Sequence, residues 1–289
     1  MRRFFIVDVF AEKRYQGNQL AVVLDCDDLS TSDMLNITRE MNYSETTFIV
    51  NPTAAQVRIF TPGEEVPFAG HPTLGTAYIL QQEVLKQEVP GLDLRVPAGV
   101  IPVTFSYADG VPEEIWMKQL PPVFGRTVNP EDMARLLNIG VADIDLNFPV
   151  QEVSTGLPFI IVPLTSLDAC RRSRPYGPDL LRFVADYDAK NILVFTRETY
   201  SLQNQLNVRV FTDYLGIPED PATGSANGCL AGYLVRHGYF GSDPVEARVE
   251  QGYEMNRPSL LLMRSQMVDS EIDIRIGGRV IPVARGTLL

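Results

Sequence analysis

The sequence has little of what a disulfide framework or a zinc centre would need. Its 289 residues include three cysteines, two histidines and one tryptophan. Cys26, Cys170 and Cys229 lie far apart and form no CxxC pair, and only two histidines, His71 and His237, are present to join them as ligands. We therefore expect no disulfide network, no metal site and no cofactor held by such residues.

Basic charge and long apolar runs are also scarce. The net charge is -11, with no cluster of Lys and Arg to offset it, so a phosphate backbone or an anionic membrane surface would be repelled. No apolar run approaches ~18 residues, and Asp8 interrupts the opening run MRRFFIVDVF before it reaches signal-peptide length. We expect a cytoplasmic protein with neither nucleic acid nor membrane as a partner.

What the sequence does contain is an internal repeat. Residues 57–80 read VRIFTPGEEVPFAGHPTLGTAYIL, and residues 208–234 read VRVFTDYLGIPEDPATGSANGCLAGYL. The strand residues match, and after a slightly longer second loop the helices match again through Gly75 and Gly228. Residues 92–103 also resemble residues 272–283. Two copies about 150 residues apart indicate a duplicated domain, because solenoid repeats run ~20 to 50 residues.

The chain length allows two domains of ordinary size. We place them at residues 1–120 and 121–289, with Pro121-Pro122 at the boundary and the last strand able to pack back on the first domain. Helices are expected from Thr31 or Ser32 to about residue 42, after the Asn129 cap, and at about residues 178–187. Strands are expected at residues 3–9, 20–24, 44–50, 92–96, 100–106, 112–118, 150–153, 159–163 and 192–195.

The helix of each repeat has no polar face. Residues 73–80 and 226–235 are apolar or small nearly all round, so each helix should be buried on every side. At about ten residues, neither is long enough to span a membrane. The sequence therefore predicts an α+β fold of two pseudo-symmetric domains, each a β-barrel-like sheet around a central helix.

The start of an enclosed helix offers backbone N–H groups and the positive end of the helix dipole to an anion. These starts are Gly70-His71-Pro72 in the first copy and Thr223-Gly224-Ser225 in the second. If the domains face each other across a pseudo-twofold axis, both starts converge on one cleft. A small-molecule carboxylate is the guest that this arrangement favours.

Several segments, in order, resemble one known family: GNQLAVV, SETTF, RIFTPGEEVPFAGHPTLGTA, DPATGSANG and QGYEMNRPS. Together they are similar to the phenazine-biosynthesis PhzF-like family, which has the diaminopimelate epimerase fold. The resemblance runs along nearly the whole chain. It implies two similar barrel domains with a cleft between them, no cofactor and a homodimer.

The resemblance also implies an activity. The characterised member isomerises trans-2,3-dihydro-3-hydroxyanthranilate by a proton shift between ring carbons, which a glutamate performs, and Glu45 of SETTF matches that glutamate. His71 and Asp220 match further catalytic positions. Four residues match or adjoin positions that would bind substrate: Ser44, Gly70, Gly224 and Ser225.

A related branch of this fold racemises amino acids with two cysteines, one before each core helix. The matching positions here are Ala69 and Ala222, and Cys229 lies about two turns inside its helix, where it should pack as a small hydrophobe. Two-base thiol chemistry is therefore disfavoured. One carboxylate would have to remove the proton and return it.

Simpler interpretations of these residues exist. Glu45 at a strand entrance could be solvated or paired with a lysine, His71 could bond the backbone, and Asp220 before a proline is a good turn former. Arg58 and Arg209, repeated in both copies, more plausibly serve the duplicated fold.

The sequence thus predicts a cofactor-independent isomerase of a small cyclic carboxylic acid. Burial would raise the pKa of Glu45 toward neutrality, which suits a general base. The alternatives are a racemase or epimerase without its thiols, and a non-catalytic carboxylate-binding protein.

Overall fold

The computed structural model describes residues 1–241 and 243–289, except for the side chain of Leu215. Contacts within the chain separate two compact units. The first comprises Met1–Lys118 together with Gly277–Leu289, and the second comprises Gln119–Ile276. Within the described residues, no helix is both long and apolar enough to cross a membrane.

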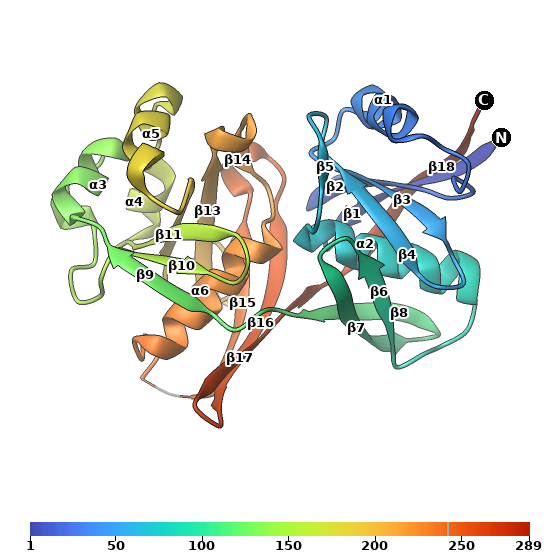
Figure 1. The fold of residues 1–289 in the computed structure, drawn as a ribbon. Coiled ribbons are helices and arrows are strands. Elements are labelled where there is room, and N and C mark those ends of the chain that lie inside the picture. Colours follow the sequence, from blue (N-terminus) through green and yellow to red (C-terminus); the bar gives the residue numbers. More distant parts are fainter. Residues whose placement is uncertain (242) are drawn as a thin grey trace. The chain divides into compact units, whose positions relative to one another are not determined.

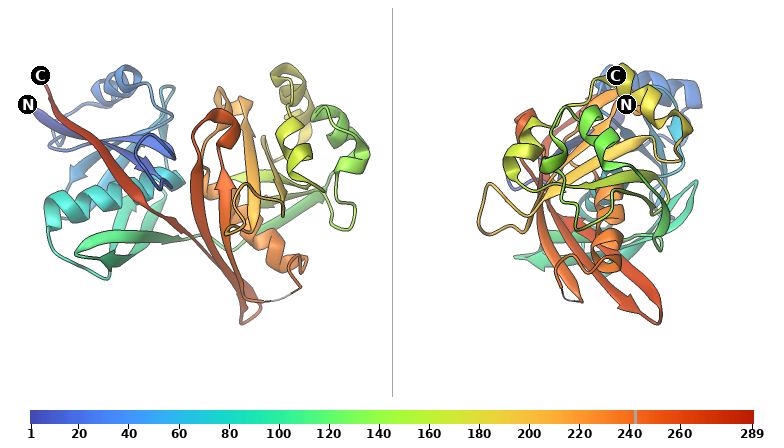
Figure 2. Two further views of the ribbon diagram at one scale, coloured as in Figure 1. Left: turned by 180° about the vertical axis from the view of Figure 1, so that it is seen from behind. Right: turned by 90° about the vertical axis from the view of Figure 1, so that its left-hand side faces the viewer.

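Strands in the first unit pair in the order β18, β1, β2, β3, β4, β6, β7 and β8. The β2–β3 and β4–β6 pairs are parallel and the others are antiparallel, and β5 pairs with β4. Figure 2 shows the strands at the two termini side by side, as their pairing from Arg2 with Leu288 to Val9 with Val280 requires. The strands are β1 (Arg2–Val9), β2 (Asn18–Val23), β3 (Thr46–Asn51), β4 (Gln56–Phe60), β5 (Glu65–Val66), β6 (Gly91–Val96), β7 (Gly99–Ala108), β8 (Val111–Lys118) and β18 (Val280–Leu288).

The N-cap of helix α1 (Thr31–Met41) lies one or two residues earlier than the cap predicted from the sequence. Ser30, not Thr31 or Ser32, is the N-cap, because its hydroxyl accepts the Asp33 N–H while the Asp33 carboxylate accepts the Ser30 N–H. This reciprocal pair is a capping box. Met34 on the buried face of α1 joins a cluster with Val23, Cys26, Phe48 and Phe60.

Helix α2 (Gly70–Ile79) is the core of the first unit (Figure 1), and all ten of its residues are buried. It contacts β1, β2, β3, β6, β7, β8 and β18, and it continues as a π-helical stretch, Leu80–Leu85. A Cβ at Gly75 would lie 2.6 Å from a Leu20 methyl carbon. The small residue therefore lets β2 approach the helix closely, and the predicted burial of this helix is confirmed.

The second unit repeats this order of pairing with β9, β10, β11, β12, β13, β15 and β16. The β11–β12 and β13–β15 pairs are parallel, the others are antiparallel, and β14 pairs with β13. The strands are β9 (Val123–Thr127), β10 (Gln151–Ser154), β11 (Pro158–Pro163), β12 (Asn191–Thr196), β13 (Leu206–Thr212), β14 (Ile217–Asp220), β15 (Val245–Gln251), β16 (Ser259–Val268) and β17 (Glu271–Gly278).

Helix α6 (Gly224–Arg236) takes the place of α2 in this unit and contacts β10, β11, β15 and β16. Ten of its thirteen residues are buried. Three shorter helices, α3 (Pro130–Leu136), α4 (Leu167–Arg172) and α5 (Gly177–Phe183), cover a separate hydrophobic cluster that includes Met133, Cys170 and Leu180. The Asn129 cap of α3 is as predicted, with its side-chain oxygen accepting two first-turn N–H groups.

One part of the predicted repeat is wrong. Residues 92–103 form the antiparallel pair β6–β7 of the first unit, whereas 272–276 lie in the second unit and β18 pairs with β1 in the first. By order of pairing, the counterparts of β6 and β7 are β15 and β16. The resemblance arose because alternating apolar and charged residues suit any half-buried strand.

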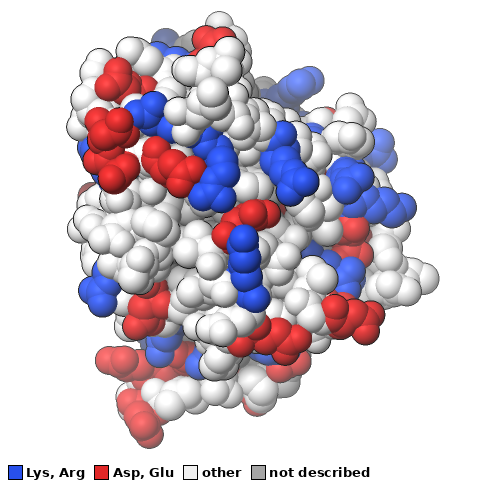
Figure 3. All heavy atoms as spheres, turned by 90° about the vertical axis from the view of Figure 1, so that its right-hand side faces the viewer, with Lys and Arg blue, Asp and Glu red and all other residues white. Residues whose placement is uncertain are grey.

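Acidic and basic side chains are intermixed on the face shown in Figure 3. Within the first unit, Arg2 forms an ion pair with Asp28 and Arg3 with Asp25. These exposed pairs contribute little stability individually.

Candidate active site

Glu45 lies immediately before β3, on the face of that strand that meets α2. Side chains two residues apart in a strand share a face, and Thr47 exchanges a 2.8 Å hydrogen bond with Thr76 of α2. The side chain of Glu45 is 19% exposed, and its Oε2 has no hydrogen-bond partner among the described residues. The Nε2 atom of His71 lies 3.5 Å from this oxygen.

The surroundings of Glu45 favour its protonated form. Burial raises the pKa of the Glu45 carboxyl above its ordinary value, and a hydrogen bond from Ser44 opposes the rise without cancelling it. The cause is desolvation, because removing a carboxylate from water disfavours its charge. A carboxyl group tuned in this direction can act as an acid and as a base near neutral pH.

The first turn of α2 lies beside Glu45 and provides backbone N–H groups. Ala69 is its N-cap and provides no side-chain acceptor, and Pro72 has no N–H. Helix geometry gives the N–H groups of Gly70 and His71 no carbonyl partner within the helix, and the first regular bond runs from the Thr73 N–H to the Ala69 carbonyl. Gly70, His71 and Glu45 are therefore brought together in the first unit, with Ser44 beside them.

The segment leading to α2 is held at two points. Arg58 of β4 binds both carboxylate oxygens of Glu65, at 2.7 and 2.5 Å, and also donates to the Thr31 hydroxyl. Further along, the Ala98 N–H donates to the Pro67 carbonyl at 3.0 Å. These bonds fix the path of the chain just before Gly70.

Asp220, Gly224 and Ser225 form a second set, within the second unit. Asp220 ends β14, and Gly224 and Ser225 open α6. The hydroxyl of the N-cap residue Thr223 donates to Asp220 Oδ2 at 2.5 Å. The Asp220 carboxylate is thus fixed beside the first turn of α6.

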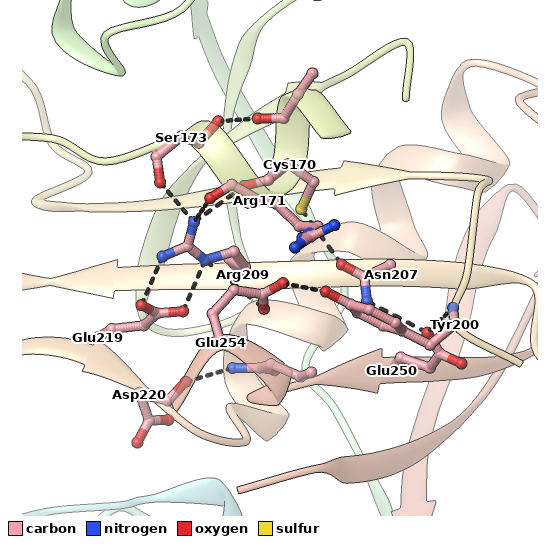
Figure 4. A network of polar contacts seen from close by, with 12 residues as sticks. Cys170, Arg171, Ser173, Tyr200, Asn207, Arg209, Glu219, Asp220, Glu250 and Glu254 are labelled. Atoms are coloured by element: carbon pink, nitrogen blue, oxygen red, sulfur yellow. Dashed lines mark hydrogen bonds and ion pairs between the residues drawn. The ribbon is translucent and has the colours of Figure 1, made fainter. Parts of the chain in front are cut away.

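Arg209 holds the segment leading to Asp220. Figure 4 shows its guanidinium between the Glu219 carboxylate and the backbone of the segment that includes Cys170 and Ser173. The two bonds to Glu219 measure 2.9 and 2.8 Å, and Nη1 donates to the carbonyl groups of Cys170, Arg171 and Ser173. Since Glu219 directly precedes Asp220, this ion pair fixes the end of β14.

The two units provide an internal comparison, because their strands pair in the same order. Arg58 with Glu65 and Arg209 with Glu219 occupy matching strands, β4 with β5 and β13 with β14, so this ion pair belongs to the shared fold. The interpretation of both arginines as structural agrees with these contacts.

Other residues differ between the units. Phe60 pairs with Thr46 and its counterpart Phe211 pairs with Ile192, so the position of Glu45 is taken by Asn191 in the second unit. The strand register likewise places Val66 opposite Asp220, because Ile59 pairs with Val66 and its counterpart Val210 pairs with Asp220. The duplicated fold therefore requires neither carboxylate.

The positions directly before the two core helices, where thiol chemistry would need cysteines, carry none. Ala69 and Ala222 precede the core helices, and Ala222 is fully buried. Cys229 lies within α6, where burial raises the pKa of its thiol to about 12. Such a thiol stays protonated near neutral pH and packs as a small side chain.

Sequence reasoning missed Gln251, and it named Thr223 only as part of a helix start; both residues bind the loop around Asp220. Both lie within segments that carried the family resemblance, QGYEMNRPS and DPATGSANG. The available signal was the position of Gln251 at the end of a strand, directly before Gly252. A Cβ at Gly252 would lie 2.6 Å from the Pro221 carbonyl oxygen, and its φ is +77°.

Comparisons with known proteins identify the family. The phenazine biosynthesis-like protein family matches residues 7–286. A trans-2,3-dihydro-3-hydroxyanthranilate isomerase from Pseudomonas aeruginosa is 33% identical over 99% of both chains. A protein from Mesorhizobium japonicum, named an uncharacterized isomerase, is 32% identical over 99% of this chain and 98% of its own.

Solved structures agree with this assignment. A phenazine biosynthesis protein of the PhzF family from Bacillus anthracis is 29% identical, with a TM-score of 0.91 over 100% of this chain and 99% of its own. A probable proline racemase from Agrobacterium radiobacter shares the fold alone, at 12% identity and a TM-score of 0.62 over 100% and 93% of the two chains. The chain belongs to the phenazine biosynthesis-like, or PhzF, family.

Proposed function

We propose that this protein is a cofactor-independent isomerase that moves a proton between carbons of a small cyclic carboxylic acid. The observation that carries the proposal is Glu45 beside the first turn of α2, a carboxyl group with a raised pKa and with one oxygen that has no hydrogen-bond partner in the described part of the chain. The relatives named trans-2,3-dihydro-3-hydroxyanthranilate isomerase make that compound the first substrate to test.

Glu45 would act first as a base and then as an acid. It accepts a proton from one ring carbon, the electron pair of the broken C–H bond moves into the conjugated system, and the same carboxyl returns a proton to another carbon. Atoms and electrons balance without an oxidant or reductant. His71, with Nε2 3.5 Å from the Glu45 oxygen, would assist by interacting with the charged form of the carboxylate.

The remaining residues are assigned to substrate binding. Gly70, Gly224 and Ser225 present helix-start N–H groups suited to a carboxylate, and Ser44 lies beside Glu45. Asp220 is a negative group, so it suits an amine or hydroxyl donor of the substrate. A guest with one carboxylate and one such donor satisfies both requirements, whereas a simple dianion does not.

Several finer properties belong to the same proposal. Two pseudo-symmetric domains, each a barrel-like sheet around its helix, are supported by the matching order of strand pairing in the two units. A homodimer and a cytoplasmic location follow from the family resemblance and from composition. Light scattering of the purified protein tests the dimer, with a mass of about twice 32.2 kDa expected.

The direct test is turnover of trans-2,3-dihydro-3-hydroxyanthranilate, followed by ¹H NMR. An isomerase moves a proton signal from one ring carbon to another, a non-catalytic carboxylate-binding protein leaves the spectrum of the ligand unchanged, and a racemase or epimerase inverts a stereocentre of an amino acid instead. No change in the ring protons, with wild-type protein shown to be folded, would contradict the proposal.

A further inference from the structure

Gln251 ends β15 and is fully buried, yet it is polar. Its side-chain amide makes four hydrogen bonds, which is the full capacity of two donors and one oxygen. Oε1 accepts from the Thr223 N–H and from Asn227 Nδ2, each at 3.1 Å, and Nε2 donates to the Asp220 carbonyl at 2.8 Å and to the Thr223 hydroxyl at 3.0 Å.

The orientation of this amide follows from two main-chain groups. The Thr223 N–H can only donate and the Asp220 carbonyl can only accept, so Oε1 must face the first and Nε2 the second. Nε2 therefore donates to the Thr223 hydroxyl, whose own proton is directed to Asp220 Oδ2, 2.5 Å away. The bonds form a directed chain from Gln251 through Thr223 to the Asp220 carboxylate.

The first unit lacks the corresponding residues. Gln56 pairs with Arg95 where Asn207 pairs with Glu250, so Val96 takes the position of Gln251. Likewise Val66 takes the position of Asp220 in the strand register, and Gly70 takes the position of Thr223 when residues are counted back from Gly75 and Gly228. A main-chain bond from the Ala98 N–H to the Pro67 carbonyl holds the loop there instead. The first unit therefore forms the same fold without a chain of side-chain hydrogen bonds at this place.

We propose that Gln251 and Thr223 are positioning residues that hold the Asp220 carboxylate in one orientation, to accept an amine or hydroxyl donor of the substrate. This inference rests on the proposed function for its substrate, but the chain of hydrogen bonds can be tested without turnover. Hydrogen bonds to carboxylates are among the stronger ones in proteins, so the bond from the Thr223 hydroxyl is suited to fixing the orientation of the Asp220 side chain.

The binding test compares anthranilate, which carries a carboxylate and an amine, with benzoate, which carries the carboxylate alone. Thr223→Val removes the hydroxyl at nearly constant shape, and Thr223→Ser retains it. We expect Thr223→Val to weaken anthranilate binding about tenfold, to leave benzoate binding within about twofold, and to raise KM more than it lowers kcat. Thr223→Ser should restore anthranilate binding.

The second arm uses the ¹⁵N-detected side-chain amide signal of Gln251, identified by its loss in Gln251→Leu. The exposed Gln203→Leu is the matched control. We expect Thr223→Val to shift the Gln251 signal and speed its hydrogen exchange, and Thr223→Ser to leave both near wild type.

Equal losses for anthranilate and benzoate in a folded Thr223→Val protein would overturn the inference, as would an unchanged Gln251 signal. If wild-type protein neither binds anthranilate nor isomerises the ring substrate, the proposed function fails. The amide signal then decides the hydrogen-bond chain by itself, with the shift supporting it and no shift refuting it.

Discussion

Replacing Glu45 with glutamine removes the proton-transfer group at almost constant shape. Loss of one general acid/base typically lowers the rate by ~10² to 10⁴-fold. At about 1.4 kcal/mol per factor of ten, this equals about 3 to 5 kcal/mol of transition-state stabilisation. Because Oε2 has no hydrogen-bond partner among the described residues, the substitution breaks no bond at that atom. We therefore expect kcat to fall by this factor in a protein that remains folded.

The same substitution should change stability in a pH-dependent way. Burial raises the pKa of Glu45, so the folded state disfavours the carboxylate more than the unfolded state does. Wild-type protein thus loses stability as pH rises from the ordinary pKa of Glu through the raised one, and Glu45→Gln does not. The difference in free energy of unfolding, variant minus wild type, should increase across that window and level off above it, as measured by urea denaturation at a series of pH values.

Glu64→Gln is the matched control, since Glu64 is an exposed carboxylate of the first unit. The assay is product formation from trans-2,3-dihydro-3-hydroxyanthranilate by ¹H NMR. We expect near wild-type kcat in the control. Full activity in Glu45→Gln would mean that another group moves the proton, and the account of Glu45 would be refuted.

Three further outcomes follow from the structure. Ala69→Ser and Ala222→Ser should leave kcat within about tenfold of wild type, since neither position carries a proton-transfer group. A loss of activity as large as that of Glu45→Gln would argue for a mechanism that also uses these positions. Arg209→Met leaves the Glu219 carboxylate, 15% exposed, without its partner, and should lower the free energy of unfolding by about 3 to 5 kcal/mol in denaturant titration; an unchanged midpoint would show that the ion pair does not hold β14. Gly75→Ala places a carbon 2.6 Å from a Leu20 methyl, so calorimetry should show a loss of about 1 to 3 kcal/mol, and a gain in stability would mean that the helix and β2 can separate without cost.

The buried helices could be predicted because composition alone determines their environment. A helix such as α2, without a polar face, can only be stable if it is covered on all sides, and its ten residues are buried. Strands with long apolar stretches, such as β11 and β12, were also predictable. Short polar strands were not: β14 has four residues, Ile217–Asp220, and is held to β13 by the ion pair of Arg209 rather than by an apolar pattern.

The site could be predicted only in part. Glu45 and His71 were found from a family resemblance, and the structure places them 3.5 Å apart, a distance that no sequence pattern encodes. Gln251 was missed because a lone glutamine at a strand end is usually solvent-exposed. Three of its four bonds reach a loop 28 to 31 positions earlier, and the fourth reaches Asn227, 24 positions earlier. The local sequence pattern indicates which face of a strand or helix a residue occupies, but not which groups from distant parts of the sequence contact it there.

The central claim is that one carboxyl, that of Glu45, both removes and returns the proton. A substrate deuterated at the reacting carbon, turned over in ordinary water, tests this most directly. The account predicts that wild-type protein transfers part of the deuterium to the receiving carbon of the product, because the label stays on a carboxyl that is only 19% exposed. Product with no deuterium at the receiving carbon, formed while the remaining substrate keeps all of its deuterium, would contradict the claim and indicate two separate proton-transfer groups.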